Sequence, residues 1–232
     1  MDRRAFRRCM HILESRHEPE DWSRGLTPFE ILVSTVLSQS TNVANERRGM
    51  EGLRTAFGRI TPQGLASQKT NDLARAIWHA GLSNRKASRI RALAGRIAAR
   101  SDDRLRDILR RPTKEARDLL LTLPGVGLKT ADVLLAMAAD RPVFPVDTHV
   151  ARIARRWGIV RPADGYEATR AGLERWTPFE KREAWHLGLI AHGRTLCKAA
   201  NPACERCAVS RDCDWFQGRA ARAAKRLKRS NR

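Results

Sequence analysis

The sequence of 232 residues has few aromatic and few acidic residues, and it contains no long apolar run. Aromatic residues make up 6% of the chain, and Asp and Glu number 25 against 45 Lys and Arg. Without an apolar run of about 20 residues, the chain offers no candidate transmembrane helix. Residues 1–18 mix charged and apolar positions and lack the apolar centre of a signal peptide, so we expect a cytoplasmic protein.

The excess of basic residues gives a formal net charge of +20 at pH 7. A charge of this size indicates a polyanionic partner, because clustered Lys and Arg side chains bind phosphate groups. Alternatively, the charge keeps the protein soluble or reflects an association with the ribosome. Residues 217–232 are basic without an apolar face, which predicts a disordered arm or solvated charge.

β-strand patterns are almost absent. Only residues 142–146 have an extended pattern, and their prolines would interrupt strand pairing. Elsewhere apolar residues recur at helical spacing, which predicts helices at 43–57, at 71–80, where Leu73, Ile77 and Trp78 recur, and at 166–176. Another predicted helix starts at Thr27-Pro28-Phe29-Glu30. This start combines an N-cap threonine, a proline at the first position and a glutamate at the third. The sequence therefore predicts an all-α fold.

The stretch from Leu121 to His149 combines a tight turn with candidate reactive side chains. Two helical patterns, at 113–122 and 128–139, flank Pro124-Gly125-Val126-Gly127. The pattern predicts a helix–hairpin–helix whose outward amides suit a phosphate oxygen, with Leu123, Gly125 and Gly127 as candidate DNA-binding residues. Lys129 follows in the first turn of the second helix, and Asp147 precedes the next helix.

Cysteine is scarce, yet four of the five cysteines lie within seventeen residues. They follow the pattern Cys-x6-Cys-x2-Cys-x5-Cys at Cys197, Cys204, Cys207 and Cys213. In a cytosolic protein this crowding indicates metal binding rather than disulfides. Four thiolates can hold either zinc or a [4Fe–4S] cluster. Cys9 stands apart, and we expect it to be buried as a small apolar residue.

LPGVGLKTA, VDTH and the cysteine spacing together resemble the helix–hairpin–helix DNA glycosylases, and endonuclease III among them. The resemblance covers roughly residues 26–216. It implies two lobes, a six-helix barrel at 28–141 and an iron–sulfur domain made of 1–27 and 142–216. It also implies a structural [4Fe–4S] cluster on the four cysteines, which presents nearby basic residues to DNA.

The resemblance further implies catalytic roles. Lys129 and Asp147, 18 positions apart, match the catalytic lysine and aspartate of the family. A neutral amine can form a Schiff base with the sugar, and a carboxylate can stabilise positive charge on it. A bifunctional DNA glycosylase and abasic-site lyase is implied, acting as a monomer on double-stranded DNA, with oxidised pyrimidines as the usual substrates.

Two further segments match positions that contact DNA in the family. Gln39, in Ser38-Gln39-Ser40-Thr41-Asn42, takes the place of a glutamine that fills the space left by an extruded base. Leu82, in the segment GLSNRKA, takes the place of a leucine wedge. The alternatives are a polar helix end in solvent for Gln39 and a leucine that packs beneath its own turn.

Each catalytic assignment also has a plainer alternative. Asp147 alone would be a helix cap, Lys129 a surface phosphate contact, and His149 either a DNA-contacting pocket residue or a structural hydrogen-bonding group. Asn42 and Leu121 replace an aspartate and a glutamate of endonuclease III, which leaves the substrate open. The runners-up are a monofunctional glycosylase in which Asp147 activates water, and a non-enzymatic DNA-binding protein.

Overall fold

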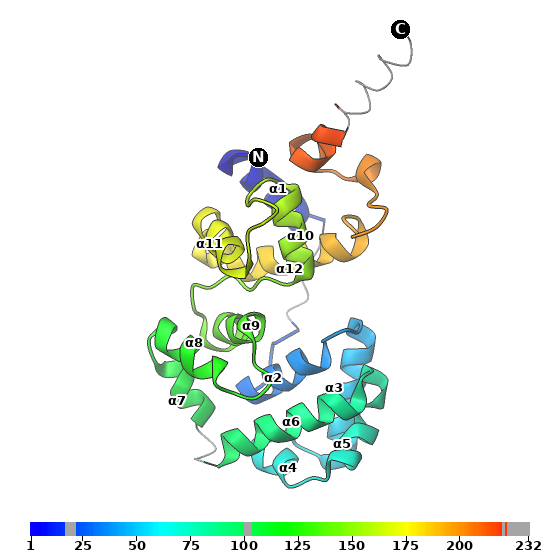
Figure 1. Ribbon diagram of the computed structural model, residues 1–232, viewed down its shortest axis with the longest axis vertical. Helices are drawn as coiled ribbons and strands as arrows, with labels where there is room; N and C mark the ends of the chain where they lie inside the picture. The colour runs from blue at the N-terminus through cyan, green and yellow to red at the C-terminus, as the bar shows by residue number, and fades with distance from the viewer. Residues whose placement is uncertain (17–21, 100–103, 220, 222–232) are drawn as a thin grey trace. The chain divides into compact units, whose positions relative to one another are not determined.

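The structure is a computed structural model of the chain, and it describes residues 1–16, 22–99, 104–219 and 221 (Figure 1). These residues form α-helices and 3₁₀ turns, with no β-strand among them, so the all-α prediction is confirmed. The chain divides into two compact units, Trp22–Arg141 and Met1–Asp21 with Pro142–Arg232, named here the hairpin unit and the cysteine unit. No helix in the described part is long and apolar enough to cross a membrane.

The hairpin unit is a set of short helices around an apolar core. Helix α2 begins with the predicted capping box, in which Thr27 and Glu30 bond each other's backbone amides, and it is buried almost all round. Gly49 and Gly52 on α3 allow close packing, since a β carbon at Gly52 would lie 2.0 Å from the Ala76 carbonyl oxygen. The elements are α2 (Pro28–Leu37), α3 (Val43–Phe57), α4 (Pro62–Ala66), α5 (Thr70–Ala76), η1 (Trp78–Ala80), α6 (Ser83–Ala98), α7 (Arg104–Arg110), α8 (Thr113–Leu121) and α9 (Leu128–Ala139).

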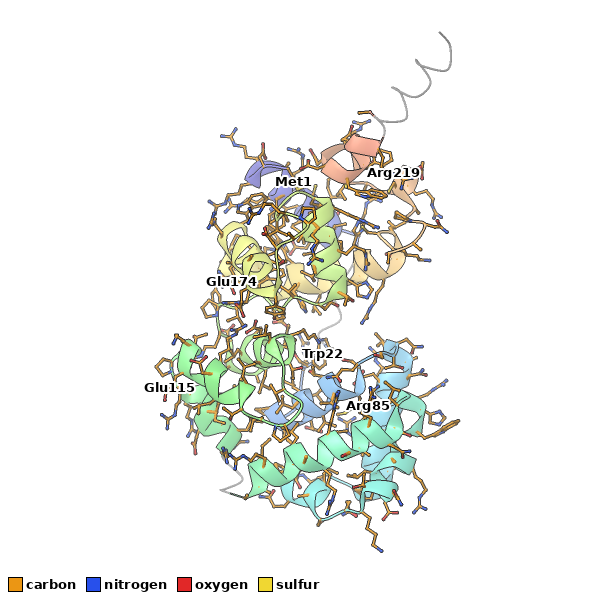
Figure 2. The ribbon with its side chains drawn as sticks, in the orientation of Figure 1. Met1, Trp22, Arg85, Glu115, Glu174 and Arg219 are labelled. Carbon is orange, nitrogen blue, oxygen red and sulfur yellow. The ribbon has the colours of Figure 1, made fainter. Side chains whose placement is uncertain are left out.

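The cysteine unit is built around aromatic side chains. Phe6 of α1 packs edge-on against Trp157, Trp176 and Trp185, with ring centroids 6.2, 5.6 and 5.6 Å away. Cys9 is fully buried in the same core, as predicted. The elements are α1 (Arg3–Glu14), α10 (Thr148–Arg156), α11 (Tyr166–Trp176), η2 (Phe179–Lys181), α12 (Arg182–Thr195), η3 (Cys204–Arg206) and η4 (Ser210–Asp212). In Figure 2, the labels Trp22, Arg85 and Glu115 mark the hairpin unit, and Met1, Glu174 and Arg219 mark the cysteine unit.

Some predicted boundaries differ from the structure. The helix predicted over 71–80 ends at Ala76, and a separate 3₁₀ turn follows, so Trp78 points outward and is 66% exposed. The reason is the backbone of Ile77, whose angles (φ −103°, ψ 16°) leave the helical range. Residues 214–219 are helical, whereas 220 and 222–232 of the predicted basic arm lie outside the described residues, as do 17–21 and 100–103.

Candidate functional site

The hairpin presents backbone amides to solvent. Gly125 has a φ of +75°, which a side chain would disfavour, and Gly127 caps α9 with an extended backbone. Among the described residues the amides of Gly125 and Gly127 donate no hydrogen bond, and both glycines are exposed. These amides and the start of α9 therefore form a concentration of free donors that suits an oxyanion.

Leu123 has a different place from the one predicted. Its side chain is 3% exposed, its amide donates to the Leu120 carbonyl at 3.0 Å, and its carbonyl accepts from Val126 at 3.2 Å. The residue anchors the turn in the core and offers no free donor to a phosphate. A DNA contact by Leu123 stays a prediction, and the free amides of this turn are those of the glycines that follow it.

Lys129 lies in the first turn of α9 and is half-buried. Three residues on, Asp132 is fully buried and takes a bidentate contact from Arg117, with Nε–Oδ1 2.6 Å and Nη2–Oδ2 3.2 Å. Bidentate guanidinium–carboxylate pairs fix orientation as well as charge. The Arg117–Asp132 ion pair and the packing of its apolar face thus fix α9, the helix that carries Lys129.

Asp147 caps α10, as predicted. Its Oδ1 accepts the Val150 amide at 2.8 Å, while Oδ2 makes no hydrogen bond to any residue that the structure describes. The preceding segment is fixed, because the Phe144 amide donates to Glu174 Oε1 at 3.0 Å and the Val146 amide to the Tyr166 hydroxyl at 3.3 Å. Asp147 therefore has one oxygen engaged as a cap and a second oxygen free for other chemistry.

His149 is packed against α12. Its Nδ1 lies 3.0 Å from Arg152 Nη2, and because a guanidinium only donates, Nδ1 accepts. A β carbon at Gly193 would lie 2.7 Å from the His149 Cβ, so only glycine fits there. These contacts favour the structural alternative for His149, and its DNA contact stays a prediction.

Gln39 and Leu82 are both accessible in the hairpin unit. Gln39 is half-buried and its Oε1 accepts from Arg89 Nη1 at 2.8 Å. Leu82 is 53% exposed and holds a left-handed backbone (φ +50°) directly before α6, while Ser40 beside Gln39 has φ +54°. Non-glycine residues in this region cost on the order of 1 kcal/mol each. Backbone strain therefore lies at both segments for which DNA contacts are predicted.

Lys86 joins these two segments. The side chain is 1% exposed, and its Nζ donates to the Leu37 carbonyl at 2.7 Å and to the Ala80 carbonyl at 2.8 Å. Burial lowers the pKa of Lys86 from its usual value of 10.5. Leu37 ends α2 just before Gln39, and Ala80 precedes Leu82 by two residues. The structure thus brings the Gln39 and Leu82 segments together around one buried ammonium group.

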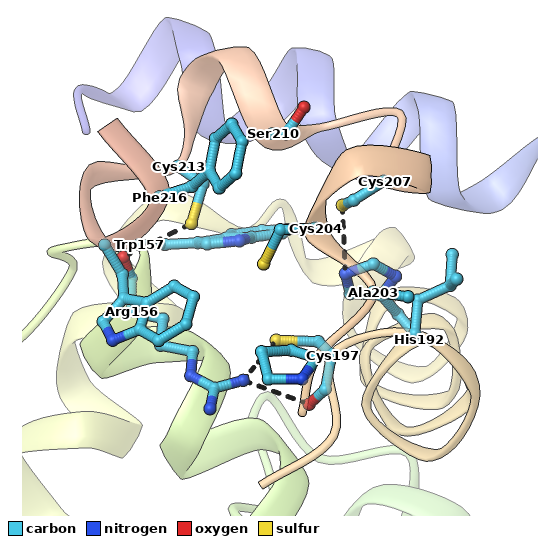
Figure 3. A pocket seen from close by; sticks show the side chains of 13 residues that line it. Arg156, Trp157, His192, Cys197, Ala203, Cys204, Cys207, Ser210, Cys213 and Phe216 are labelled. Atoms are coloured by element: carbon cyan, nitrogen blue, oxygen red, sulfur yellow. Dashed lines mark hydrogen bonds between the residues drawn. The ribbon is translucent and has the colours of Figure 1, made fainter. Parts of the chain in front are cut away.

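The four cysteines line a single cavity in the cysteine unit (Figure 3). The cavity encloses about 320 Å³ of space, part of it open to solvent, and Trp157, Trp215 and Phe216 contribute apolar walls. Burial raises the pKa of the Cys204, Cys207 and Cys213 thiols, and the neighbouring cysteines raise it further. A bound metal would offset the repulsion among these groups as thiolates, since metal ligation deprotonates cysteine.

Two arginines of α10 hold the cysteine loop. Arg156 donates to Cys197 Sγ at 3.2 Å, to the Lys198 carbonyl at 2.8 Å and to the Ala199 carbonyl at 3.0 Å. Arg152 donates to the Cys197 carbonyl at 2.9 Å, and His192 Nε2 lies 3.8 Å from Cys207 Sγ. Figure 3 shows the Arg156 and His192 contacts from either side of the cavity. Helix α10 thus carries Asp147 at its start and the anchors of the loop toward its end.

Four thiols line the cavity, and this donor set suits either a tetrahedral metal ion or an iron–sulfur cluster. Within the described residues, no three His, Cys, Asp or Glu side chains converge as closely as a bound metal ion would require. Tetrahedral zinc, with bonds near 2.3 Å, would bring the sulfurs within about 4 Å of one another. A four-iron cluster places its thiolates around a larger core. All four thiols face one cavity, so the donor set fits such a cluster.

Four residues of these sites were not predicted from the sequence: Lys86, Arg89, Arg152 and Arg156. One signal for Lys86 exists, because it occupies a core position of α6 in register with Ile90, Leu93 and Ile97, all of which are fully buried. A lysine at such a position must find buried acceptors. The three arginines carry no comparable signal, since basic residues are abundant along the whole chain.

Comparisons with known proteins agree with this arrangement. A model of the HhH-GPD superfamily of base excision DNA repair proteins matches residues 33–179. The endonuclease III of Thermotoga maritima is 34% identical over 83% of this chain and 85% of that protein, and the Bacillus subtilis enzyme is 34% identical over 83% of each.

A solved structure of a trapped covalent endonuclease III–DNA intermediate matches with a TM-score of 0.81 and 28% identity, over 95% of this chain and 99% of that one. The predicted family is therefore confirmed. The chain belongs to the HhH-GPD superfamily of base excision DNA repair proteins, and it is a DNA glycosylase of the endonuclease III type.

Proposed function

We propose that the protein removes damaged bases from double-stranded DNA and cleaves the resulting abasic sites, with Lys129 as nucleophile and Asp147 as the stabilising carboxylate. The observation that carries this proposal is the position of Lys129, in the first turn of α9 directly behind the hairpin. The solved endonuclease III relative was trapped as a covalent intermediate with DNA, which requires a nucleophile on that protein.

The proposed chemistry begins with extrusion of the damaged nucleotide from the duplex. The neutral Lys129 amine attacks C1′, the C1′–N bond breaks, and the electron pair leaves with the base. Asp147 Oδ2 stabilises positive charge that develops on the sugar, while Oδ1 stays on its cap. Ring opening gives an imine between Nζ and C1′, and loss of a C2′ proton then expels the 3′ phosphate by β-elimination.

DNA binding is proposed to rest on phosphate contacts. The free amides of Gly125 and Gly127 at the start of α9 suit a phosphate oxygen, and the net charge of +20 supplies long-range attraction. Gln39 and Leu82 would occupy the space left by the extruded nucleotide. Oxidised pyrimidines are the proposed substrates, and we propose that the protein acts as a monomer in the cytoplasm, at the nucleoid.

We also propose that Cys197, Cys204, Cys207 and Cys213 hold a [4Fe–4S] cluster in the cavity of Figure 3. When bound, the cluster supplies four metal–thiolate bonds that fix the loop. The loop then presents Lys198, Arg206 and Arg211 to DNA phosphates. Arg156 contacts Cys197 Sγ at 3.2 Å and so helps to hold this proposed ligand in the cavity.

Borohydride trapping tests the proposed nucleophile, because borohydride reduces an imine to a stable covalent link. The wild-type protein should form a covalent complex with an abasic duplex. Lys129→Gln, which keeps the length but loses the amine, should abolish trapping and strand cleavage and leave DNA affinity within a factor of about three. Lys114→Gln, at an exposed position of α8, is the matched control and should trap normally.

The proposed catalytic role of Asp147 can be tested separately from its role as the N-cap of α10. Asn caps helices as well as Asp does, so Asp147→Asn should keep the free energy of unfolding. Base excision should fall by about 100-fold, and cleavage of a preformed abasic site should fall less. Full trapping by Lys129→Gln would place the nucleophile elsewhere, and base release without any trapping in the wild type would support the monofunctional alternative.

A further inference from the structure

Two exposed aromatic side chains lie directly before Leu82 in the hairpin unit. Trp78 of η1 is 66% exposed, and its indole Nε1 donates to Nε2 of the neighbouring His79 at 3.1 Å. The centroids of the two rings are 5.1 Å apart. Because the indole nitrogen already has its acceptor in His79, Trp78 offers a ligand the apolar face of its ring.

A tight turn joins these rings to Leu82. The Gly81 amide donates to the Trp78 carbonyl at 3.2 Å, so the chain reverses direction between the two residues. Ala80, inside the turn, is fully buried, and its carbonyl accepts the Lys86 Nζ donor at 2.8 Å. Leu82 follows the turn with its left-handed backbone and its exposed side chain. The aromatic pair and the proposed wedge therefore lie on one restrained segment.

The charge around the aromatic pair suits a polynucleotide. Asp72 is the only acidic residue between positions 70 and 98, and its carboxylate is engaged in an ion pair within α5. Arg85 lies in the first turn of α6, and Arg48 precedes the glycine of α3 that packs against η1, and both are exposed. An apolar ring beside exposed guanidinium groups can contact a base while its neighbours contact phosphates.

An exposed ring face selects an unpaired base. Aromatic side chains stack on bases in proteins that bind single strands, and each stacked base raises affinity by roughly tenfold. In a paired duplex the adjacent base pairs cover both faces of every base, so a base must leave the stack before a protein ring can stack on it. Stacking tolerates any base, because every base has a π face. The rings therefore suit an unpaired base beside the position that Leu82 is proposed to enter.

We propose that Trp78 and His79 form a stacking site for an unpaired base next to the lesion. This inference rests on the proposed function, because it requires Leu82 to enter the duplex. Trp78 supplies the ring, His79 holds the indole nitrogen, and the site does not distinguish one base from another. It extends the substrate class from fully paired duplexes to damaged DNA that carries a bulged base beside the damage.

Binding of an uncleavable duplex tests the site. The full chain is titrated with duplexes that carry a tetrahydrofuran abasic analogue, either fully paired on both sides or with one extra unpaired base beside the analogue. The extra base is placed in each strand in turn, and the bulged duplex that binds more tightly is used with the variants. Trp78→Ala should weaken binding of the bulged duplex by roughly tenfold and of the paired duplex by less than about twofold. Trp78→Phe should retain most of the affinity, and His79→Ala should lie between the two.

Phe179→Ala is the matched control. Phe179 is also an exposed aromatic residue, but it lies in η2 of the cysteine unit, so the ratio of the two affinities should stay at the wild-type value. The loss in Trp78→Ala should be the same at low and high salt, because stacking releases no counterions. The urea midpoints of both alanine variants should match that of the wild type, since both side chains are exposed.

The outcomes separate the stacking site from the proposed reaction. Equal losses on the paired and bulged duplexes would make Trp78 a general DNA contact and overturn the inference, as would no loss on either duplex. A preference for the bulged duplex that depends on Trp78 would uphold the stacking site, even in a protein that excises no base. Normal excision and trapping by the wild type, without that preference, would leave the proposed function standing and refute the stacking site.

Discussion

The hairpin unit and the cysteine unit hold their candidate functional segments by different means. In the hairpin unit, the Gln39 and Leu82 segments converge on Lys86, whose ammonium group is buried beneath them. In the cysteine unit, the chain between α12 and residue 214 forms only two short 3₁₀ turns, η3 and η4. Guanidinium groups of α10 bind its carbonyl oxygens from one side, and the thiols face the cavity from within.

The two units therefore differ in what keeps these segments rigid. The hairpin unit supplies its own donors from a buried side chain, so its segments should stay in place without any added group. The cysteine loop has little regular structure and few buried apolar residues of its own, with Val209 and Cys213 as exceptions. We therefore expect the order of the loop, and not that of the hairpin unit, to depend on the proposed metal cluster.

The largest expected effect is the loss of a cluster ligand. Cys204→Ser should abolish bound iron and remove hydrogen-exchange protection over residues 196–213, while protection over 22–99 is unchanged. Cys9→Ser is the control, because Cys9 lies outside the cavity and donates to Asp212 Oδ2, which a serine would also do. Iron and visible absorption retained in Cys204→Ser, or zinc in place of iron in the wild type, would contradict the assignment.

The next effect concerns the buried lysine. Lys86→Met keeps the length of the side chain but leaves the Leu37 and Ala80 carbonyls without their donor, which should lower the free energy of unfolding by about 2 kcal/mol. Protection should fall at residues 36–42 and 78–86, and the cysteine loop should be unaffected. Urea unfolding measures the free energy, and hydrogen exchange measures the local protection. A more stable Lys86→Met protein would show that the burial of a charge costs more than its two hydrogen bonds contribute.

A smaller effect of opposite sign is expected at Leu82. Glycine adopts the left-handed backbone of this position without strain, so Leu82→Gly should raise the free energy of unfolding by about 0.5–1 kcal/mol. Leu82→Ala keeps the strain and removes the wedge, and it should give no such gain. Both variants should excise bases from duplex DNA more slowly than the wild type. If thermal unfolding shows Leu82→Ala to be more stable than Leu82→Gly, the prediction of backbone strain at this position is refuted.

The smallest effect is a pH dependence at Glu46 of α3. Burial raises the pKa of this carboxyl above 4.5, although Ser34 Oγ donates to it at 2.8 Å. A raised folded-state pKa contributes stability below the unfolded value, and that stability is lost as pH rises through the folded value. Glu46→Gln should therefore gain about 0.5 kcal/mol at pH 7–8 and nothing near pH 4, and exposed Glu51→Gln should show no such difference.

Local features of the sequence predicted much of the fold. The capping box at Thr27 and the N-cap at Asp147 were readable because a cap depends on residues three positions apart. The bounds of α3 and α11 match the predicted helices for the same reason, since their apolar periodicity is continuous. The spacing of the cysteines, likewise local, predicted a shared site, and all four line one cavity.

The contacts that position the candidate residues depend on distant partners. Lys86 bonds a carbonyl 49 residues away, and Arg156 bonds carbonyls more than 40 residues away. Backbone carbonyls are the same at every position, so no residue type marks them as partners in the sequence. Trp78 was misplaced for a related reason, because helical spacing continues past Ile77 in the sequence but not in the backbone.

The left-handed backbones at Ser40 and Leu82 carry a consequence for how this chain changes under selection. Selection for folding alone would replace both residues with glycine or asparagine, which occupy that region at lower cost. Selection for repair would oppose this drift wherever the side chain contacts DNA. A library randomised at positions 40 and 82 can be sorted once for solubility and once for survival of DNA damage. The residues selected in the two sorts should then differ, and the position at which they differ is the one whose side chain enters the duplex.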